Sequence, residues 1–179
     1  ARQSGQQDRS AARLTNPMLS LVTGKSSVRP AAVAGVFYPQ DAAELRDTVL
    51  RLLGDAAPHG AAHDPTKALI VPHAGYAYSG MVAASAYRRL RESCGSIRNV
   101  ALIGPSHRVP MRGLAMPSVD AFETPLGAIP IDRVARQRLR ELGLAGISDA
   151  AHSAEHSLEV QLPFLQVVLP AFELLPIAT

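Results

Sequence analysis

Residues 67–104 decide the predicted fold and read KALIVPHAGYAYSGMVAASAYRRLRESCGSIRNVALIG. KALIVP (67–72) and IRNVALIG (97–104) are apolar runs of strand length, and neither alternates as a strand with one solvent-facing side would. MVAASAYRRLRES (81–93), between them, is rich in good helix formers. The order strand, helix, strand predicts a right-handed βαβ unit whose two strands are parallel neighbours in a buried sheet.

Two further helices are expected on either side of this unit. Asp41 followed by Glu44 is a capping-box pattern, and apolar residues at helical spacing carry that helix to about residue 54. Asp132 and Gly143 have the residue types preferred before and after a second helix. The chain is therefore predicted to be an α/β protein. Short strands or extended segments are expected at 33–39, 114–131 and 173–179.

Composition and charge exclude several classes of protein. Apolar residues make up 47% of the 179 residues and charged residues 18%, which is typical of a globular chain and not of a disordered one. No apolar run approaches the length of a membrane-spanning helix, so we expect no membrane association. The net charge of +3 comes from residues 1–29, which carry +4, so we expect no nucleic-acid binding by the remainder. A single cysteine, Cys94, favours a reducing, cytoplasmic setting.

The first 28 residues differ in character from the rest of the chain. Residues 1–28 are rich in Gln, Ser and Arg and show no sustained periodicity. We expect them to form a flexible N-terminal extension. Residues 29–179 are expected to form a single domain, and its last strand stops without a turn or polar tail, so we expect the chain to be a fragment.

Two short stretches with a similar pattern place a histidine at equivalent positions. LIVPHAG (69–75) and LIGPSHR (102–108) each run from a buried strand through a proline to a histidine. Ligands of open parallel sheets bind outside the carboxyl ends of the strands. Because neighbouring strands lie about 4.8 Å apart, His73 and His107 would enter one crevice and could share a metal ion. Imidazole ligands suit iron, copper and zinc alike, so the pair does not identify the metal.

A second cluster of polar residues occurs in AHSAEHSLEVQLPF (151–164). We expect a helix from about residue 154 to residue 169 that kinks or restarts at Pro163. In such a helix Glu155, His156 and Glu159 would share a face. Glu155 fits equally well as a first-turn carboxylate that interacts with the helix dipole and as a group in the cleft.

Several motifs together resemble the MEMO family, over roughly residues 29–179 and in the family's order. The resemblance implies a mixed, mostly parallel sheet flanked by helices, as in the class III extradiol (LigB-type) dioxygenases, with a metal site at one sheet edge. The closest bacterial and archaeal group is the AmmeMemoRadiSam system protein B, which implies a radical SAM protein and an AMMECR1-like protein as partners. The motifs are AGVFYP (34–39), PHAGYAYSG (72–80), IGPSHRVP (103–110), TPLG (124–127) followed by Asp132, and EHSLEVQLPF (155–164).

The resemblance also assigns roles to individual residues. His73 and His107 match the two histidines that bind metal in the family, with copper or iron as the expected ion. Phe37 and Tyr78 match aromatic residues that line the family's cleft, and Glu155 and His156 match its acidic-histidine segment on the same cleft. A later Ser-Ser-Asp…His segment and a cysteine ligand of the family have no counterpart up to Thr179.

Three functions remain open on this sequence. The first is a MEMO-like, metal-dependent redox protein, which would be an oxidoreductase. The second is an extradiol-type, non-haem iron dioxygenase, although its usual ligand set includes a carboxylate. The third is a non-enzymatic module whose cleft binds a small molecule, a peptide or a partner protein.

Overall fold

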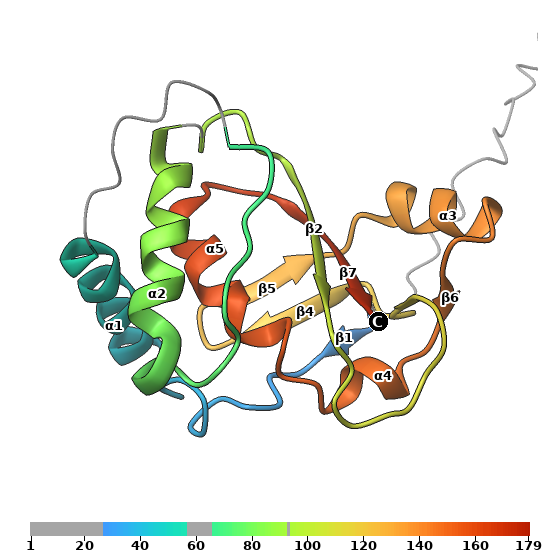
Figure 1. Cartoon of the computed structure of the whole chain (residues 1–179), viewed down its shortest axis with the longest axis horizontal. Helices are drawn as coiled ribbons and strands as arrows, with labels where there is room; N and C mark the ends of the chain where they lie inside the picture. The colour runs from blue at the N-terminus through green and yellow to red at the C-terminus, as the bar shows by residue number, and fades with distance from the viewer. Residues whose placement is uncertain (1–26, 57–65, 93) are drawn as a thin grey trace, which may run out of the picture.

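The computed structural model describes residues 27–56, 66–92 and 94–179 (Figure 1). The predicted N-terminal extension, apart from residues 27 and 28, lies outside the described residues. The described strands form two sheets, one with the order β2-β7-β3-β6 and one with the order β1-β4-β5. Their bounds are β1 Val28–Arg29, β2 Asn99–Gly104, β3 Ala115–Met116, β4 Ala121–Thr124, β5 Gly127–Pro130, β6 Gly146–Ile147 and β7 Glu173–Ala178.

The predicted α/β class is confirmed, with both parallel and antiparallel strand pairs. Strands β2 and β7 run parallel over six residue pairs, from Asn99 opposite Glu173 to Gly104 opposite Ala178. Strand β3 pairs antiparallel with β7 and parallel with β6, while β4 pairs parallel with β1 and antiparallel with β5. The predicted strands at 97–104 and 173–179 are therefore correct, and they are direct neighbours.

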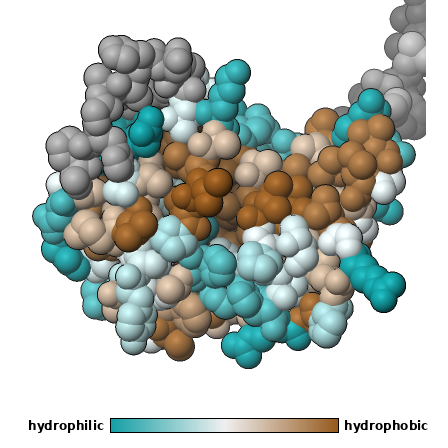
Figure 2. Space-filling view, viewed as in Figure 1, coloured by the Kyte–Doolittle hydropathy of each residue, from teal (hydrophilic) through white to brown (hydrophobic). Residues whose placement is uncertain are grey.

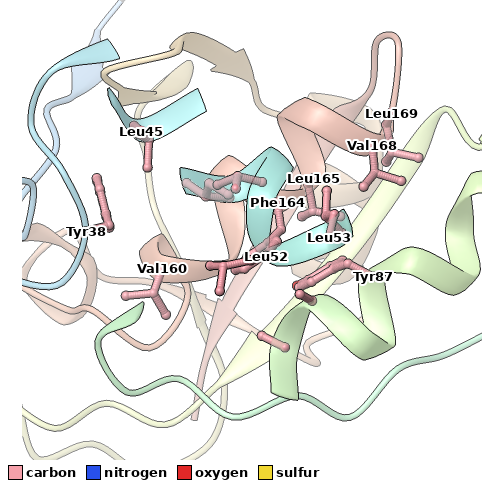
Figure 3. Packing of buried hydrophobic residues seen from close by; sticks show 14 of the residues in the cluster. Tyr38, Leu45, Leu52, Leu53, Tyr87, Val160, Phe164, Leu165, Val168 and Leu169 are labelled. Atoms are coloured by element: carbon pink, nitrogen blue, oxygen red, sulfur yellow. The ribbon is translucent and has the colours of Figure 1, made fainter. Parts of the chain in front are cut away.

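Helices pack on both faces of the larger sheet, with α3 against β7 on the side opposite the main core (Figure 1). The main core lies where α1, α2 and α5 pack together against β2 and β7, and its side chains are shown in Figure 3. Tyr87 stacks on Phe164 there with ring centroids 5.1 Å apart. The helices are α1 Ala42–Asp55, α2 Tyr76–Tyr87, α3 Arg133–Glu141, α4 Ala150–Ser153 and α5 Leu162–Val168, with 3-10 turns η1 Arg88–Glu92 and η2 Glu159–Gln161.

Both helices predicted from their capping residues are present. Asp41 Oδ1 accepts a hydrogen bond from the backbone N–H of Glu44 at 2.9 Å, which caps α1. Asp132 Oδ1 accepts one from the N–H of Ala135 at 2.8 Å, which caps α3. Gly143 has a φ of +67°, the left-handed conformation that commonly ends a helix. Local sequence signals were sufficient at these three helix ends because each cap involves residues within one turn.

The strand predicted at 67–72 is absent, and the βαβ interpretation of residues 67–104 is therefore wrong. Residues 66–73 have no strand partner among the described residues, and β2 pairs with β7 instead. Ile70 is fully exposed, which an inner strand of a covered sheet would not allow. The apolar run has strand-forming residues, but a strand also needs a partner, and a cavity separates this run from β2. Helix α2 also begins earlier than predicted, at Tyr76 and not at Met81.

The helix predicted over 154–169, with a kink or restart at Pro163, is wrong in its first part. Helix α4 ends at Ser153, residues 154–158 form turns, and a new helix, α5, begins at Leu162. Pro163 lies in the first turn of α5, where its missing N–H costs no hydrogen bond. The predicted restart at Pro163 is thus confirmed, but Glu155 and His156 lie in a turn and not on a helix face.

The segment at 33–39 forms turns with one β-bridge, between Ala34 and Tyr38. No helix among the described residues is long and apolar enough to cross a bilayer.

Candidate metal centre

Three histidines from three separate segments meet at one end of the larger sheet. His73 precedes α2, His107 lies in the loop after β2, and His156 lies in the turn between α4 and η2. Their ligand nitrogens all lie within 4.8 Å of one another. The ring centroids are 5.2 Å apart for His73 and His107, 5.7 Å for His73 and His156, and 4.6 Å for His107 and His156. Two nitrogens on one ion lie at most about 4 Å apart, twice a metal–nitrogen bond, so small side-chain rotations would complete the site.

Glu155 lies behind two of these histidines. Its Oε1 accepts a hydrogen bond from Nδ1 of His107 at 2.9 Å and lies 3.3 Å from Nδ1 of His156. The same carboxylate accepts backbone N–H groups from His107 at 2.6 Å, His156 at 2.9 Å and Ser157 at 2.8 Å. The Glu155 side chain is almost completely buried, so these donors replace the water that a carboxylate needs.

This environment keeps Glu155 ionised and His156 neutral. Burial raises the pKa of Glu155, but the hydrogen bonds from His107 and Ser157 outweigh it and lower the pKa to about 2. Burial lowers the pKa of His156, and the nearby His107 and His73 lower it further, while Glu155 acts in the opposite direction. At neutral pH, His156 therefore offers a ring nitrogen with a free lone pair.

The ionised carboxylate also fixes the tautomer of His107. A carboxylate can only accept hydrogen bonds, so Nδ1 of His107 carries the proton and Nε2 keeps its lone pair. A histidine that donates one N–H to a carboxylate while its other nitrogen faces an ion is the usual arrangement in metal proteins. The donor set present therefore fits a transition-metal ion.

A buried ion pair holds the turn that carries Glu155 and His156. Arg29 pairs with Glu159, and both side chains are almost inaccessible to solvent. Arg29 also donates to the backbone oxygens of His152 and Glu155, each at 2.8 Å. Glu159 additionally accepts hydrogen bonds from the hydroxyl of Tyr38 and from two backbone N–H groups after β1. The interactions of Arg29 and Glu159 thus connect β1 to both ends of the turn.

Gly104 allows the same turn to approach the end of β2. A Cβ at this position would lie 2.8 Å from Leu158 Cδ2 and 3.1 Å from Ser157 Oγ. The Ser157 hydroxyl donates to the backbone oxygen of Pro105 at 2.7 Å. The glycine that ends β2 therefore brings the loop of His107 against the turn of His156.

An open cleft is lined by two of the three histidines, His73 and His156. Its volume is about 810 Å³, and Phe37, Tyr78, His73 and His156 are among its lining residues. Phe37 packs on His156 with ring centroids 4.6 Å apart. Tyr78 is 89% exposed and lies at the cleft surface. The cleft is thus partly apolar, with imidazole nitrogens at one side.

The structure gathers most of the residues singled out in the sequence, but by a different route from the predicted one. His73 and His107 lie together although residues 67–72 do not form a strand. Glu155 contacts His107 directly, whereas Glu159, expected on the same helix face, turns away to Arg29. His156, assigned from the resemblance to the cleft lining, joins the histidine pair as a third candidate ligand.

Sequence comparison finds a family that matches most of the chain. The family model described as Memo-like protein matches residues 29–179. The chain belongs to the Memo family. A MEMO1 family protein of Aquifex aeolicus is 42% identical over 151 residues, which cover 84% of this chain and 54% of the relative. A MEMO1 family protein of Methanothermobacter thermautotrophicus is 38% identical over 156 residues, covering 84% and 56%, and one of Pyrococcus furiosus is 40% identical over 140 residues, covering 78% and 47%.

This Memo family chain spans about half the length of the curated relatives it matches.

Sequence reasoning missed Arg29 as the residue that holds the site's turn. Its two contacts there are 123 and 126 residues away along the chain, so no local pattern signals them.

Proposed function

We propose that His73, His107 and His156 hold a copper or iron ion and that the chain serves metal-dependent redox chemistry in the adjacent cleft. The observation that supports this most directly is the convergence of three imidazole nitrogens in front of a buried, ionised glutamate. Neutral nitrogen donors suit first-row transition metals, and the family resemblance favours copper or iron over zinc. When bound, the ion would supply an open coordination position at which oxygen or a reducible substrate reacts.

The residues of this chain would contribute binding and orientation. Glu155 keeps Nδ1 of His107 protonated, so Nε2 of that ring is available as a ligand. Phe37, packed on His156, limits the rotation of that ring and shields it from water. The cleft beside Tyr78 would take a small molecule or a peptide. We also propose, from the family resemblance, that a radical SAM protein and an AMMECR1-like protein are partners of this chain.

An extradiol dioxygenase is the less favoured alternative. Its usual ligand set is two histidines and one carboxylate. Glu155 is the only carboxylate in contact with the histidine cluster among the described residues, and four N–H groups already occupy it. Oxygen uptake with catechols after anaerobic loading with Fe(II) would favour the dioxygenase function. No oxygen uptake under these conditions would exclude it.

Anaerobic titration with Cu(I) and Fe(II) tests the metal site. We expect one ion per chain, and we expect His73→Ala with His107→Ala to abolish tight binding. His152→Gln is the matched control, because His152 lies four residues from His156 but points to the backbone oxygen of Ala115 at 3.0 Å. Unchanged affinity in the double variant would refute the proposal.

A further inference from the structure

A buried phenol and a buried carboxylate form a pair next to the histidine cluster. The Tyr38 hydroxyl donates a hydrogen bond to Oε1 of Glu159 at 2.6 Å. Tyr38 is 4% exposed and Glu159 is 0% exposed, so both side chains lie beneath the molecular surface, one face of which Figure 2 shows. Both oxygens of Glu159 accept hydrogen bonds, and the carboxylate pairs with Arg29. A short O–H···O⁻ hydrogen bond of this kind is stronger than one between neutral groups.

Short covalent paths and ring contacts connect this pair to the histidine cluster. Tyr38 directly follows Phe37, whose ring packs on His156 with a centroid distance of 4.6 Å. Glu159 lies three residues after His156 along the chain. The Tyr38 ring also packs on Tyr76, with the ring centroids 5.7 Å apart. The route from Tyr38 to an ion in the cluster therefore runs through packed side chains and backbone.

Among the four tyrosines, which all lie in the described part of the chain, Tyr38 is the one that donates to a carboxylate. Tyr76 and Tyr87 are also buried, but their hydroxyls donate to amide oxygens, of the backbone and of Gln161 respectively. An amide oxygen binds a proton far less readily than a carboxylate does. Tyr78 is 89% exposed. Tyr87 lies on the opposite side of the core from Tyr38 (Figure 3), so it serves below as a control.

Tyr38 keeps its proton at neutral pH. Burial raises the pKa of the Tyr38 hydroxyl well above its usual value, and the hydrogen bond to Glu159 and the charge of Glu159 raise it further, while the charge of Arg29 opposes them. Loss of one electron from Tyr38 would therefore start from the neutral phenol. An oxidised phenol is a much stronger acid than the phenol itself, so its proton moves to a base within hydrogen-bond reach. Glu159 is that base, because burial keeps water away from the hydroxyl.

We propose that Tyr38 is a one-electron donor to the histidine cluster and that Glu159 accepts its proton. This inference rests on the proposed function, because the oxidant is an oxidised copper or iron ion held by the cluster. In the step, the O–H bond of Tyr38 breaks, an O–H bond to Oε1 of Glu159 forms, and one electron reduces the ion. The products are a neutral Tyr38 radical, a neutral Glu159 carboxylic acid and the reduced ion.

Arg29 favours the return of the proton after this step. While Glu159 is protonated, the buried guanidinium of Arg29 has no anion beside it, which is unfavourable. The reverse transfer restores both the Tyr38 phenol and the Arg29–Glu159 pair. Tyr38 would thus supply one electron beyond the one that a single ion provides, and the protein interior would hold the proton in place.

Freeze-quench electron paramagnetic resonance of the whole 179-residue chain tests the electron transfer. The chain is loaded anaerobically with Fe(II) or Cu(I) and mixed with hydrogen peroxide, which oxidises the ion. All proteins carry Tyr78→Phe, so that the exposed tyrosine does not compete. We expect a tyrosyl radical signal that Tyr38→Phe abolishes. Tyr87→Phe is the matched control, since it removes a buried hydroxyl that donates to an amide, and it should leave the signal unchanged.

Two measurements test the proton transfer to Glu159. Glu159→Gln keeps an oxygen near the Tyr38 hydroxyl but removes the base, so it should lower the radical yield at least about tenfold. Circular dichroism checks that this variant is folded. The rate of radical formation in D₂O and in H₂O, measured without a substitution at Glu159, decides the same question if the variant does not fold. Radical formation should be slower in D₂O, because the proton moves together with the electron.

The results that overturn this inference differ from those that overturn the proposed function. Metal binding without a radical that depends on Tyr38, a radical that only Tyr87→Phe removes, or equal rates in D₂O and H₂O would overturn the inference and leave the metal site standing. If the chain binds no metal, the proposed function fails. Flash-generated tris(bipyridyl)ruthenium(III) then oxidises the metal-free chain, and no radical that depends on Tyr38 would overturn the redox role of the Tyr38–Glu159 pair as well.

Discussion

The carboxylate of Glu155 accepts a hydrogen bond from Nδ1 of His107 at 2.9 Å, although 48 residues separate the two along the chain. This contact orients the ring that follows β2 toward the rings of His73 and His156. Because the pKa of Glu155 is lowered to about 2, the contact persists over the whole range in which the histidines can bind a metal. Four predictions follow from the surroundings of this pair.

Glu155→Gln should lower metal affinity about 10- to 100-fold, the usual cost of removing a carboxylate that orients a histidine ligand. The variant keeps the size of the side chain but loses the negative charge that fixes the His107 tautomer. Competition with a chelator of known affinity measures the change. Glu123→Gln, at an exposed position of β4, is the control and should bind metal as the wild type does. Equal affinity of the Glu155 and Glu123 variants would contradict the role given to Glu155.

His156→Ala should weaken metal binding at least about tenfold, because a third nitrogen donor would be lost. Calorimetric titration of the purified variant with Cu(I) or Fe(II) under anaerobic conditions measures the affinity. His152→Gln should keep the wild-type affinity, since the buried His152 ring lies outside the cluster. If His156→Ala retained full affinity, the site would be formed by His73, His107 and a ligand other than His156.

Arg29→Met should destabilise the fold by about 3–5 kcal/mol, because it leaves the buried carboxylate of Glu159 without its cation. It should also lower metal affinity, since Arg29 holds the backbone of the turn at His152 and Glu155. Urea unfolding measures the free energy of unfolding. Arg133→Met removes an exposed pair with Asp120 and should cost no more than about 1 kcal/mol. Similar losses of stability in the two variants would show that the buried Arg29–Glu159 pair contributes no more to the free energy of unfolding than the exposed Arg133–Asp120 pair.

Asp149 should make the fold sensitive to acid. Hydrogen bonds from the side chain and the backbone N–H of Ser118 lower the pKa of Asp149 in the folded state. A carboxylate with a depressed folded pKa stabilises the fold above its unfolded pKa of about 3.9, and this contribution is lost as the pH falls through the folded pKa. Asp149→Asn should therefore lose less stability than the wild type between pH 6 and pH 3.

Urea midpoints at several pH values between 6 and 3 measure this difference. Ser118→Ala removes one of the two hydrogen bonds and should show an intermediate dependence. Glu155 contributes to acid sensitivity in the same direction but is present in all three proteins, so it cancels in the comparison. Identical pH dependence in the wild type and Asp149→Asn would contradict the prediction.

Local sequence patterns predicted the elements whose stabilising contacts are themselves local. Asp41 and Asp132 identified the starts of α1 and α3, because a capping side chain bonds to an N–H three residues later. The apolar runs at 97–104 and 173–179 identified β2 and β7, because both strands are needed to bury the sheet interior. The pattern could not show that these two strands pair with each other across about 70 residues.

Two predictions failed because tertiary contacts overrode local preference. KALIVP (67–72) has the composition of a strand, but the described chain offers it no partner. The segment from 154 to 158 has helix-forming residues, but Arg29 binds the backbone oxygens of His152 and Glu155, and Glu155 binds the N–H groups of His156 and Ser157. These backbone groups are then not available to a continuous helix.

The sequence by itself determined the Memo family, the α/β class, the capped helices and the placement of His73 and His107 at the ends of apolar runs. Only the tertiary structure brought His156 to these two rings and placed Glu155 behind them. The physical reason is distance along the chain. Capping and periodicity act within a few residues, whereas the histidine cluster joins three segments whose approach depends on the buried Arg29–Glu159 pair and on the close packing at Gly104.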